Sequence, residues 1–121
     1  MFSRAGGGRE VNLKLVEPDD QANALELERR VLRALCQEPA LRARGRTALR
    51  EYRWRDLAHR VVFEIAISAP AIPAEQLRQA LPTRLTNAGF PDFPWEELFR
   101  PPSVSRKDAE LLILKLRLRT T

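Results

Sequence analysis

The chain has 121 residues and a net charge of +5, and 44% of its residues are hydrophobic and 31% are charged. This length suits one domain with a single core, and the composition excludes the low-hydrophobicity class of disordered chains. The single cysteine excludes an intramolecular disulfide, and no segment approaches the roughly 20 apolar residues that a membrane span requires. We therefore expect a soluble, cytoplasmic domain without a membrane contact.

The first 18 residues are expected to form a flexible leader, followed by a single helical domain over residues 19–121. Three consecutive glycines at positions 6–8 favour flexibility. Apolar and polar residues then alternate over residues 11–16, so this segment is also a candidate short strand. The first helix is predicted over residues 21–37, where apolar side chains recur every three or four residues and Asp19 and Asp20 can cap the first turn.

Two further helices are predicted in the middle of the chain. A weaker one covers residues 40–52 and is interrupted at Gly45. The next covers residues 57–68 and has Asp56 as a candidate cap. Few of its positions are polar, so we expect it to be the most buried helix of the domain.

A fourth helix is predicted to begin at Pro73, because the missing amide of a proline has no partner in a first turn anyway. It is expected to end near Leu81, because Pro82 follows and proline breaks helices. One or two further turns over residues 83–88 are expected to close at Gly89.

The last helix is predicted to start at a capping box formed by Ser105 and Asp108 and to reach about Arg119. Leucines alternate with other residues over 112–118, so a strand that pairs with residues 11–16 is the competing interpretation. Helix is favoured because leucine, lysine, arginine and glutamate prefer it. The predicted fold class is therefore all-α, a compact orthogonal or bundle-like arrangement of five to six helices with a flexible leader.

Two motifs within residues 27–81 resemble those of a known helical family. The run E-R-R-V-L-R-A-L starts at Glu28 and is followed by Pro39, and the run W-R-D-L-A-H-R-V-V-F extends from Trp54 to Phe63. They are similar to motifs of the helical domain shared by the amino terminus of bacterial replicative helicases and the carboxy terminus of bacterial primases. In that family E-x-x-V-L-x-x-L ends at a proline, and H-R-x-[IV]-F opens the next long helix.

The resemblance implies a helical hairpin module that recognises another protein at a replication fork, or a stand-alone descendant recruited to a different partner, and it implies no catalysis by this domain. Most matched positions are helix caps and core residues, so those of the second motif are expected to be structural: Trp54, Asp56, His59, Arg60 and Phe63. The chain lacks the motor domain of a helicase and the zinc ribbon and catalytic domain of a primase. The glycines at 6–8 are not followed by the Lys and Ser/Thr pair of a phosphate-binding loop.

The sequence offers no residues suited to catalysis or metal binding. His59 is the only histidine and Cys36 the only cysteine, so neither a two-histidine metal site nor a catalytic triad with a second histidine can be built. Glu96 and Glu97 are adjacent and would point about 100° apart on a helix, which does not suit a shared-proton pair. We expect a non-enzymatic chain with no catalytic residue, cofactor or metal.

Four aromatic residues lie in a proline-rich segment around a short helix predicted over residues 95–99: Phe90, Phe93, Trp95 and Phe99. Aromatic rings on a stiff backbone are frequent anchors for a protein partner. Burying such rings is also worth about 1.5 to 3 kcal/mol each, so a lid folded over the core is the competing interpretation.

Ten arginines lie between Arg29 and Arg60 against three acidic residues. Solvated helix faces explain most such charge runs. Within the basic segment from Arg42 to Arg60, the candidate contacts to nucleic acid are Arg46, Arg50, Arg53 and Arg55, with Tyr52 and Trp54 available for base stacking. An inward-folded Trp54 competes with stacking. A protein-protein interaction domain is therefore the leading hypothesis, and a nucleic-acid-binding module is the second.

Overall fold

The computed structural model describes residues 12–68, 71–101 and 104–119, which contain five α-helices, two 3₁₀ helices and no strand. In chain order these are α1 (Asn12–Gln37), a 3₁₀ helix (Pro39–Leu41), α2 (Arg42–Ala48), α3 (Leu57–Ser68), α4 (Ala74–Asn87), a second 3₁₀ helix (Trp95–Phe99) and α5 (Arg106–Leu118). The predicted all-α fold of five to six helices is confirmed.

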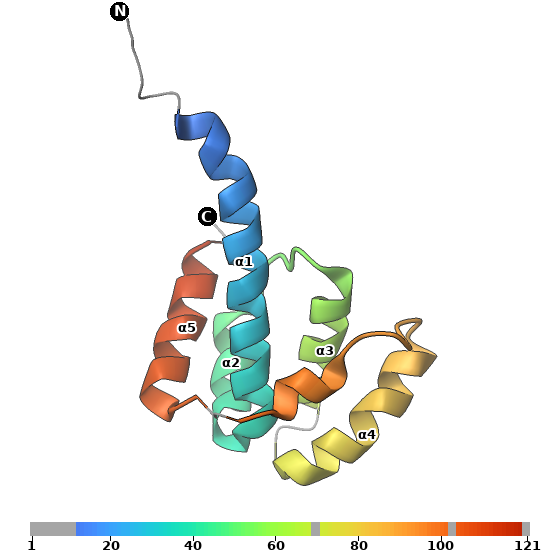
Figure 1. The fold of residues 1–121 in the computed structure, drawn as a ribbon. Coiled ribbons are helices and arrows are strands. Elements are labelled where there is room, and N and C mark those ends of the chain that lie inside the picture. The colour runs from blue at the N-terminus through green and yellow to red at the C-terminus, as the bar shows by residue number, and fades with distance from the viewer. Residues whose placement is uncertain (1–11, 69–70, 102–103, 120–121) are drawn as a thin grey trace, which may run out of the picture.

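Helix α1 is the longest element, and the other four α-helices all contact it. Helix α5 lies along one side of α1, while α3 and α4 lie on the other side, with α2 packed behind α1 (Figure 1). The 3₁₀ helix Trp95–Phe99 lies beside the C-terminal end of α1, between α1 and α4 (Figure 1). The first turns of α1 project beyond the rest of the molecule (Figure 1).

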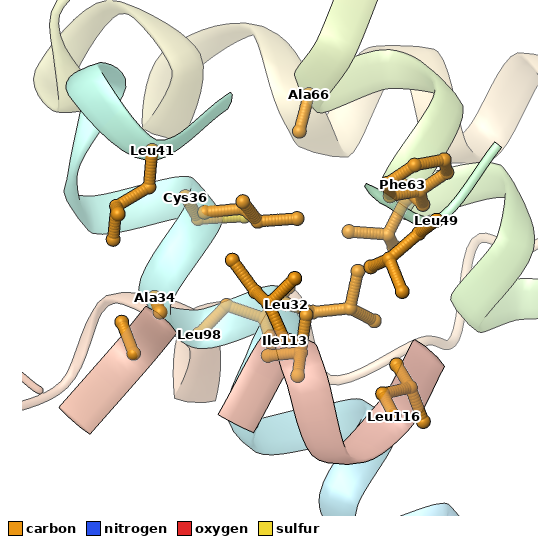
Figure 2. Packing of buried hydrophobic residues seen from close by; sticks show 14 of the residues in the cluster. Leu32, Ala34, Cys36, Leu41, Leu49, Phe63, Ala66, Leu98, Ile113 and Leu116 are labelled. Carbon is orange, nitrogen blue, oxygen red and sulfur yellow. The ribbon is translucent and has the colours of Figure 1, made fainter. Parts of the chain in front are cut away.

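One hydrophobic core joins all of these elements. Leu32 and Cys36 of α1 face Phe63 of α3, Ile113 of α5 and Leu98 of the second 3₁₀ helix, as Figure 2 shows. Each of these side chains is almost completely buried. Burying a leucine, isoleucine or phenylalanine is worth about 1.5 to 3 kcal/mol, so the core contacts of α1 hold the helices together.

The expected start of the first helix is wrong. Helix α1 begins at Asn12, so Asp19 and Asp20 lie inside it and not at its first turn. The candidate strand over residues 11–16 is also wrong from Asn12 onwards, because leucine and lysine in this segment favour a helix and the proposed partner strand, residues 112–118, belongs to α5. Residues 1–11 of the predicted leader lie outside the described residues.

The expected end of the fourth helix is also wrong, because α4 continues through Pro82 to Asn87. Leu77, Leu81 and Leu85 follow one another at four-residue spacing on α4, and all three are fully buried. Their packing offsets the loss of one backbone hydrogen bond at the proline. Gly89 has a positive φ of 97° after the helix end, as expected for a glycine that terminates a helix.

The weak helix predicted over residues 40–52 is shorter in the structure. Helix α2 ends at Ala48, and Gly45 lies inside it instead of interrupting it. A Cβ atom on Gly45 would lie only 2.8 Å from Cδ2 of Leu35, so the glycine allows α2 to approach α1 closely.

Arg42 is fully buried at the start of α2 and joins three parts of the backbone. Its Nε donates a hydrogen bond to the carbonyl of Leu35 at 2.7 Å, its Nη2 to Cys36 at 2.9 Å and its Nη1 to Ile72 at 2.6 Å. The first two carbonyls belong to the last turn of α1, where backbone acceptors have no partner within the helix. Arg42 therefore caps α1 and fixes the segment before α4.

The predicted cap of the last helix is confirmed. The Ser105 hydroxyl accepts a hydrogen bond from the backbone amide of Asp108 at 3.2 Å, and α5 follows from Arg106. Ala109, Ile113 and Leu116 form the buried face of α5. Their spacing of four and three residues is helical, which decides against the strand interpretation.

Candidate interaction surfaces

A buried carboxyl group fixes the loop between α2 and α3. Glu28 of α1 is 0% exposed. Its Oε2 accepts hydrogen bonds from the Tyr52 hydroxyl at 2.5 Å and from the backbone amide of Arg55 at 2.7 Å. Its Oε1 lies 2.7 Å from Nδ1 of His59. Three groups from one loop and the following helix therefore converge on one side chain of α1, which is how buried polar groups are normally satisfied.

The expected structural residues of the second motif each have their own contacts, and one of them binds this buried group. His59 is buried against Glu28. The Asp56 carboxylate accepts a hydrogen bond from the Ala58 amide at 2.8 Å at the start of α3, so it forms the expected cap. The rings of Trp54 and Phe63 lie 5.0 Å apart between centroids. Arg60 is exposed and pairs with Glu64 at 3.1 Å.

The four aromatic residues of the proline-rich segment are all partly buried against the core. Phe93 packs edge-on against His59 at a centroid distance of 6.0 Å, and Trp95 packs against Phe99 at 6.4 Å. Phe93 also lines a cavity of about 300 Å³ between α1 and this segment, and Arg33 of α1 lines the same cavity. These contacts support the lid interpretation for Phe90, Phe93, Trp95 and Phe99.

Three of the four arginines proposed to contact nucleic acid line one groove. Arg50, Arg53 and Arg55 surround Trp54 at a groove of about 480 Å³ between the α2–α3 loop and α3. Arg46 is exposed but does not line the groove. Arg42, at the start of the proposed basic segment, is buried and bound to carbonyl groups, so it is not a surface cation.

The Tyr52 and Trp54 rings at this groove are held by protein contacts. Tyr52 is buried, its hydroxyl binds Glu28, and its ring meets that of Trp54 edge-on at 5.0 Å. Trp54 is half-buried and packs against the core. The groove therefore offers guanidinium groups more readily than open ring faces.

An exposed leucine stripe on α5 was not singled out from the sequence. Leu111, Leu114 and Leu118 are 52%, 47% and 64% exposed, although they lie on the same helix as the buried face. They are spaced by three and four residues, so they form a second apolar stripe. The signal was present in the leucine-rich sequence of α5, but which stripe faces the core depends on how the helix packs.

Reactive groups are scarce within residues 12–68, 71–101 and 104–119. No group of three or more His, Cys, Asp or Glu side chains there is placed to hold a metal ion. Burial raises the pKa of the Cys36 thiol from 9.0 to about 12, which makes it a poor nucleophile. No helix in this part of the chain is both long and apolar enough to cross a bilayer.

Comparisons with known proteins give no relative from which a role could be transferred. No family model, curated protein or solved structure matches this chain. The functional conclusion therefore depends on the residues and their geometry.

Proposed function

We propose that this chain is a non-enzymatic, cytoplasmic protein-protein interaction domain, similar in role to the contact module of replicative helicases and primases. The observation that carries the proposal is the exposed leucine stripe of α5. Leu57, Leu111, Leu114 and Leu118 are the large hydrophobic residues that are exposed among the described ones, and three of the four lie on this one helix. Apolar side chains gathered on one face are characteristic of surfaces that bind other proteins.

The replication part of this proposal rests on the resemblance of the two motifs alone, and their contacts are structural. Glu28 opens the first motif and His59 belongs to the second, and the two side chains meet in the interior 31 residues apart. This contact joins the two motifs, so both help to hold α1 and α3 together. The partner is proposed to be a replication protein on this resemblance.

The proposal is tested with the full chain and with purified replicative helicase and primase from the same organism. Isothermal titration calorimetry of each protein against the chain is expected to show micromolar or tighter binding to one of them. The variant Arg78→Gln, which changes one exposed charge away from α5, should bind with the same affinity as the original chain. Absence of heat and of co-elution with both proteins would remove the replication assignment.

A nucleic-acid-binding module is the second candidate, favoured by the groove that Arg50, Arg53 and Arg55 share with Trp54. Arg50 and Arg53 form no ion pair within the described residues, so their charge is available to phosphate groups. The fixed rings and the ion pair of Arg60 with Glu64 make this candidate the weaker one.

Fluorescence anisotropy with single-stranded and duplex DNA over a range of salt concentrations tests the second candidate. If Arg50 and Arg53 each contact one phosphate, replacing both with Gln should lower the slope of log affinity against log salt by about 1.4, at roughly 0.7 per contact on single strands. The double variant Arg78→Gln with Arg106→Gln removes the same charge elsewhere and should leave the slope unchanged. Undetectable binding at low salt would eliminate the nucleic-acid function.

A further inference from the structure

The leucine stripe of α5 borders a groove formed with α2. The groove has a volume of about 500 Å³, and its apolar wall includes Leu111 and Leu114 of α5 and Ala48 of α2. Leu118 extends the stripe by one further turn. From Leu111 to Leu118 the stripe spans about 10 Å along α5, since a helix rises about 1.5 Å per residue, which is a length that a short helix can cover.

The rim of this groove is basic. Arg44, Lys107 and Arg117 line it, with Glu110 as the one acidic residue. Nη1 of Arg44 lies 3.6 Å from Oε2 of Glu110, so the charges of these two side chains neutralise each other. Lys107 and Arg117 are exposed and form no salt bridge with a described residue, so two positive charges stay available beside the apolar wall.

The charge at the rim selects among possible occupants. A second copy that docked through its own α5 would bring the same lysine and arginine side chains against Lys107 and Arg117, and like charges across an interface are unfavourable. The first eleven residues of the chain carry two arginines and one glutamate, so they do not match a basic rim either. A helix with apolar side chains on one face and carboxylates beside them satisfies both the wall and the rim.

We infer that the groove between α2 and α5 binds one amphipathic helix of another protein. Its apolar side chains contact Leu111, Leu114 and Leu118, and its acidic side chains face Lys107 and Arg117. This inference rests on the proposed protein-binding function and names the surface and the chemistry of the partner segment. Apolar contact supplies most of the affinity, and the charges set which helices are accepted.

Two synthetic probes test the inference with the full chain. Both are fluorescein-labelled peptides of about 18 residues with leucines at helical spacing, and they differ only in carrying Glu or Lys beside the leucines. Fluorescence anisotropy is expected to show binding of the Glu peptide, with the Lys peptide bound at least about tenfold more weakly.

Variants of the chain locate the binding. Leu114→Asp should weaken binding of the Glu peptide by about tenfold or more, because it places a like charge in the apolar wall. Leu57→Asp changes another exposed leucine, 60% exposed against 47% for Leu114, that lies on α3 away from this groove, and it should leave affinity unchanged. Lys107→Glu combined with Arg117→Glu should reverse the preference towards the Lys peptide. Circular dichroism melting of each variant verifies that it is folded.

Several outcomes would overturn the inference: equal binding of the two peptides, no binding of either, or affinity that does not change in Leu114→Asp. Sedimentation showing that the chain self-associates through Leu114 would assign the groove to a second copy instead. The helicase and primase titrations separate this inference from the proposed function. A replication partner that still binds Leu114→Asp contradicts the groove alone, whereas groove-dependent peptide binding without either replication partner contradicts the replication assignment alone.

Discussion

At the residue scale, two buried polar side chains organise the molecule, and the sequence alone reveals neither role. Glu28 belongs to an apolar-rich motif, but nothing in the sequence says that Tyr52 and His59 meet it in the interior. Arg42 opens the basic segment of the sequence, yet it is buried and binds three carbonyl groups. The contacts with Tyr52, His59 and Ile72 join residues 24 to 31 positions apart in the chain, and only the packing of helices determines them.

The Glu28→Gln variant tests the role of the buried carboxyl group. Its Oε2 accepts hydrogen bonds from the Tyr52 hydroxyl and the Arg55 amide, and its Oε1 meets Nδ1 of His59. A glutamine has one oxygen, so its NH₂ group must face either these two donors or His59, and the charge of the carboxylate is lost. We expect the free energy of unfolding to fall by about 1 to 3 kcal/mol, the cost of leaving a buried polar group without its partner. Urea denaturation followed by tryptophan fluorescence measures this change, because Trp54 lies in the loop that Glu28 fixes.

Glu26→Gln is the matched control for this variant. Glu26 lies on the same helix but is exposed, and among the described residues it pairs with Arg29 and Arg30. Exposed pairs of this kind contribute a few tenths of a kcal/mol, so the control should be nearly as stable as the original chain. Equal stability of Glu28→Gln and Glu26→Gln would show that the buried contacts of Glu28 do not stabilise the fold.

At the element scale, the helices were predicted in kind and order, while several of their ends were not. A local sequence signal correctly predicted the start of α5, where Ser105 caps the helix. Proline and glycine signals failed in α4 and α2, because the burial of Leu81 and Leu85 carries α4 past Pro82, and Gly45 serves the contact with Leu35. The preference of glycine and proline against a helix amounts to about 1 to 3 kcal/mol, and the free energy gained by burying one apolar side chain is of the same size.

Gly45→Ala tests whether this glycine serves packing. Alanine would favour the helix by about 1 kcal/mol from propensity alone. Its Cβ would lie 2.8 Å from Cδ2 of the fully buried Leu35, however, and overpacking of a core costs about 1 to 3 kcal/mol. We expect a net loss of about 1 kcal/mol, measured by thermal unfolding. A gain in stability would mean that Leu35 moves aside at no cost.

At the scale of the whole molecule, the all-α class followed from periodicity, whereas the surfaces did not. Val62, Phe63 and Ala66 of α3 are buried, but Leu57, which belongs to the same apolar pattern, is 60% exposed. The aromatic segment had two open interpretations, and the structure places all four rings against the core. The exposed stripe of α5, in contrast, could not be predicted, because the sequence of a helix with two apolar faces does not say which face is buried.

The stability of the whole fold is expected to decrease at alkaline pH. Burial raises the pKa of Cys36 from 9.0 to about 12, and burial together with the hydrogen bond to Glu28 raises the pKa of Tyr52 above its ordinary 10.0. Above pH 9 the unfolded chain therefore releases protons that the folded chain keeps. The stabilisation is fully present below pH 9 and is lost as the pH rises towards 12.

Urea denaturation at a series of pH values from 7 to 11 measures this dependence. The free energy of unfolding should begin to fall near pH 9 in the original chain, and the fall should be shallower in Cys36→Ala, which lacks the buried thiol. The alanine substitution also removes packing of the Cys36 side chain at every pH. The slope of the free energy of unfolding against pH is therefore the informative quantity. Parallel profiles for the two chains would assign the alkaline loss to other groups.

The dependence of the α2–α3 loop on Glu28 also limits how small a working piece of this protein can be. Tyr52 and His59 bind Glu28 of α1, a helix that ends well before the loop begins in the sequence. The positions of Arg50, Arg53 and Arg55 relative to one another therefore depend on α1. A synthetic fragment of residues 46–60 would carry the same cations without their arrangement. Minimal versions of the domain must therefore retain α1 together with the loop it anchors.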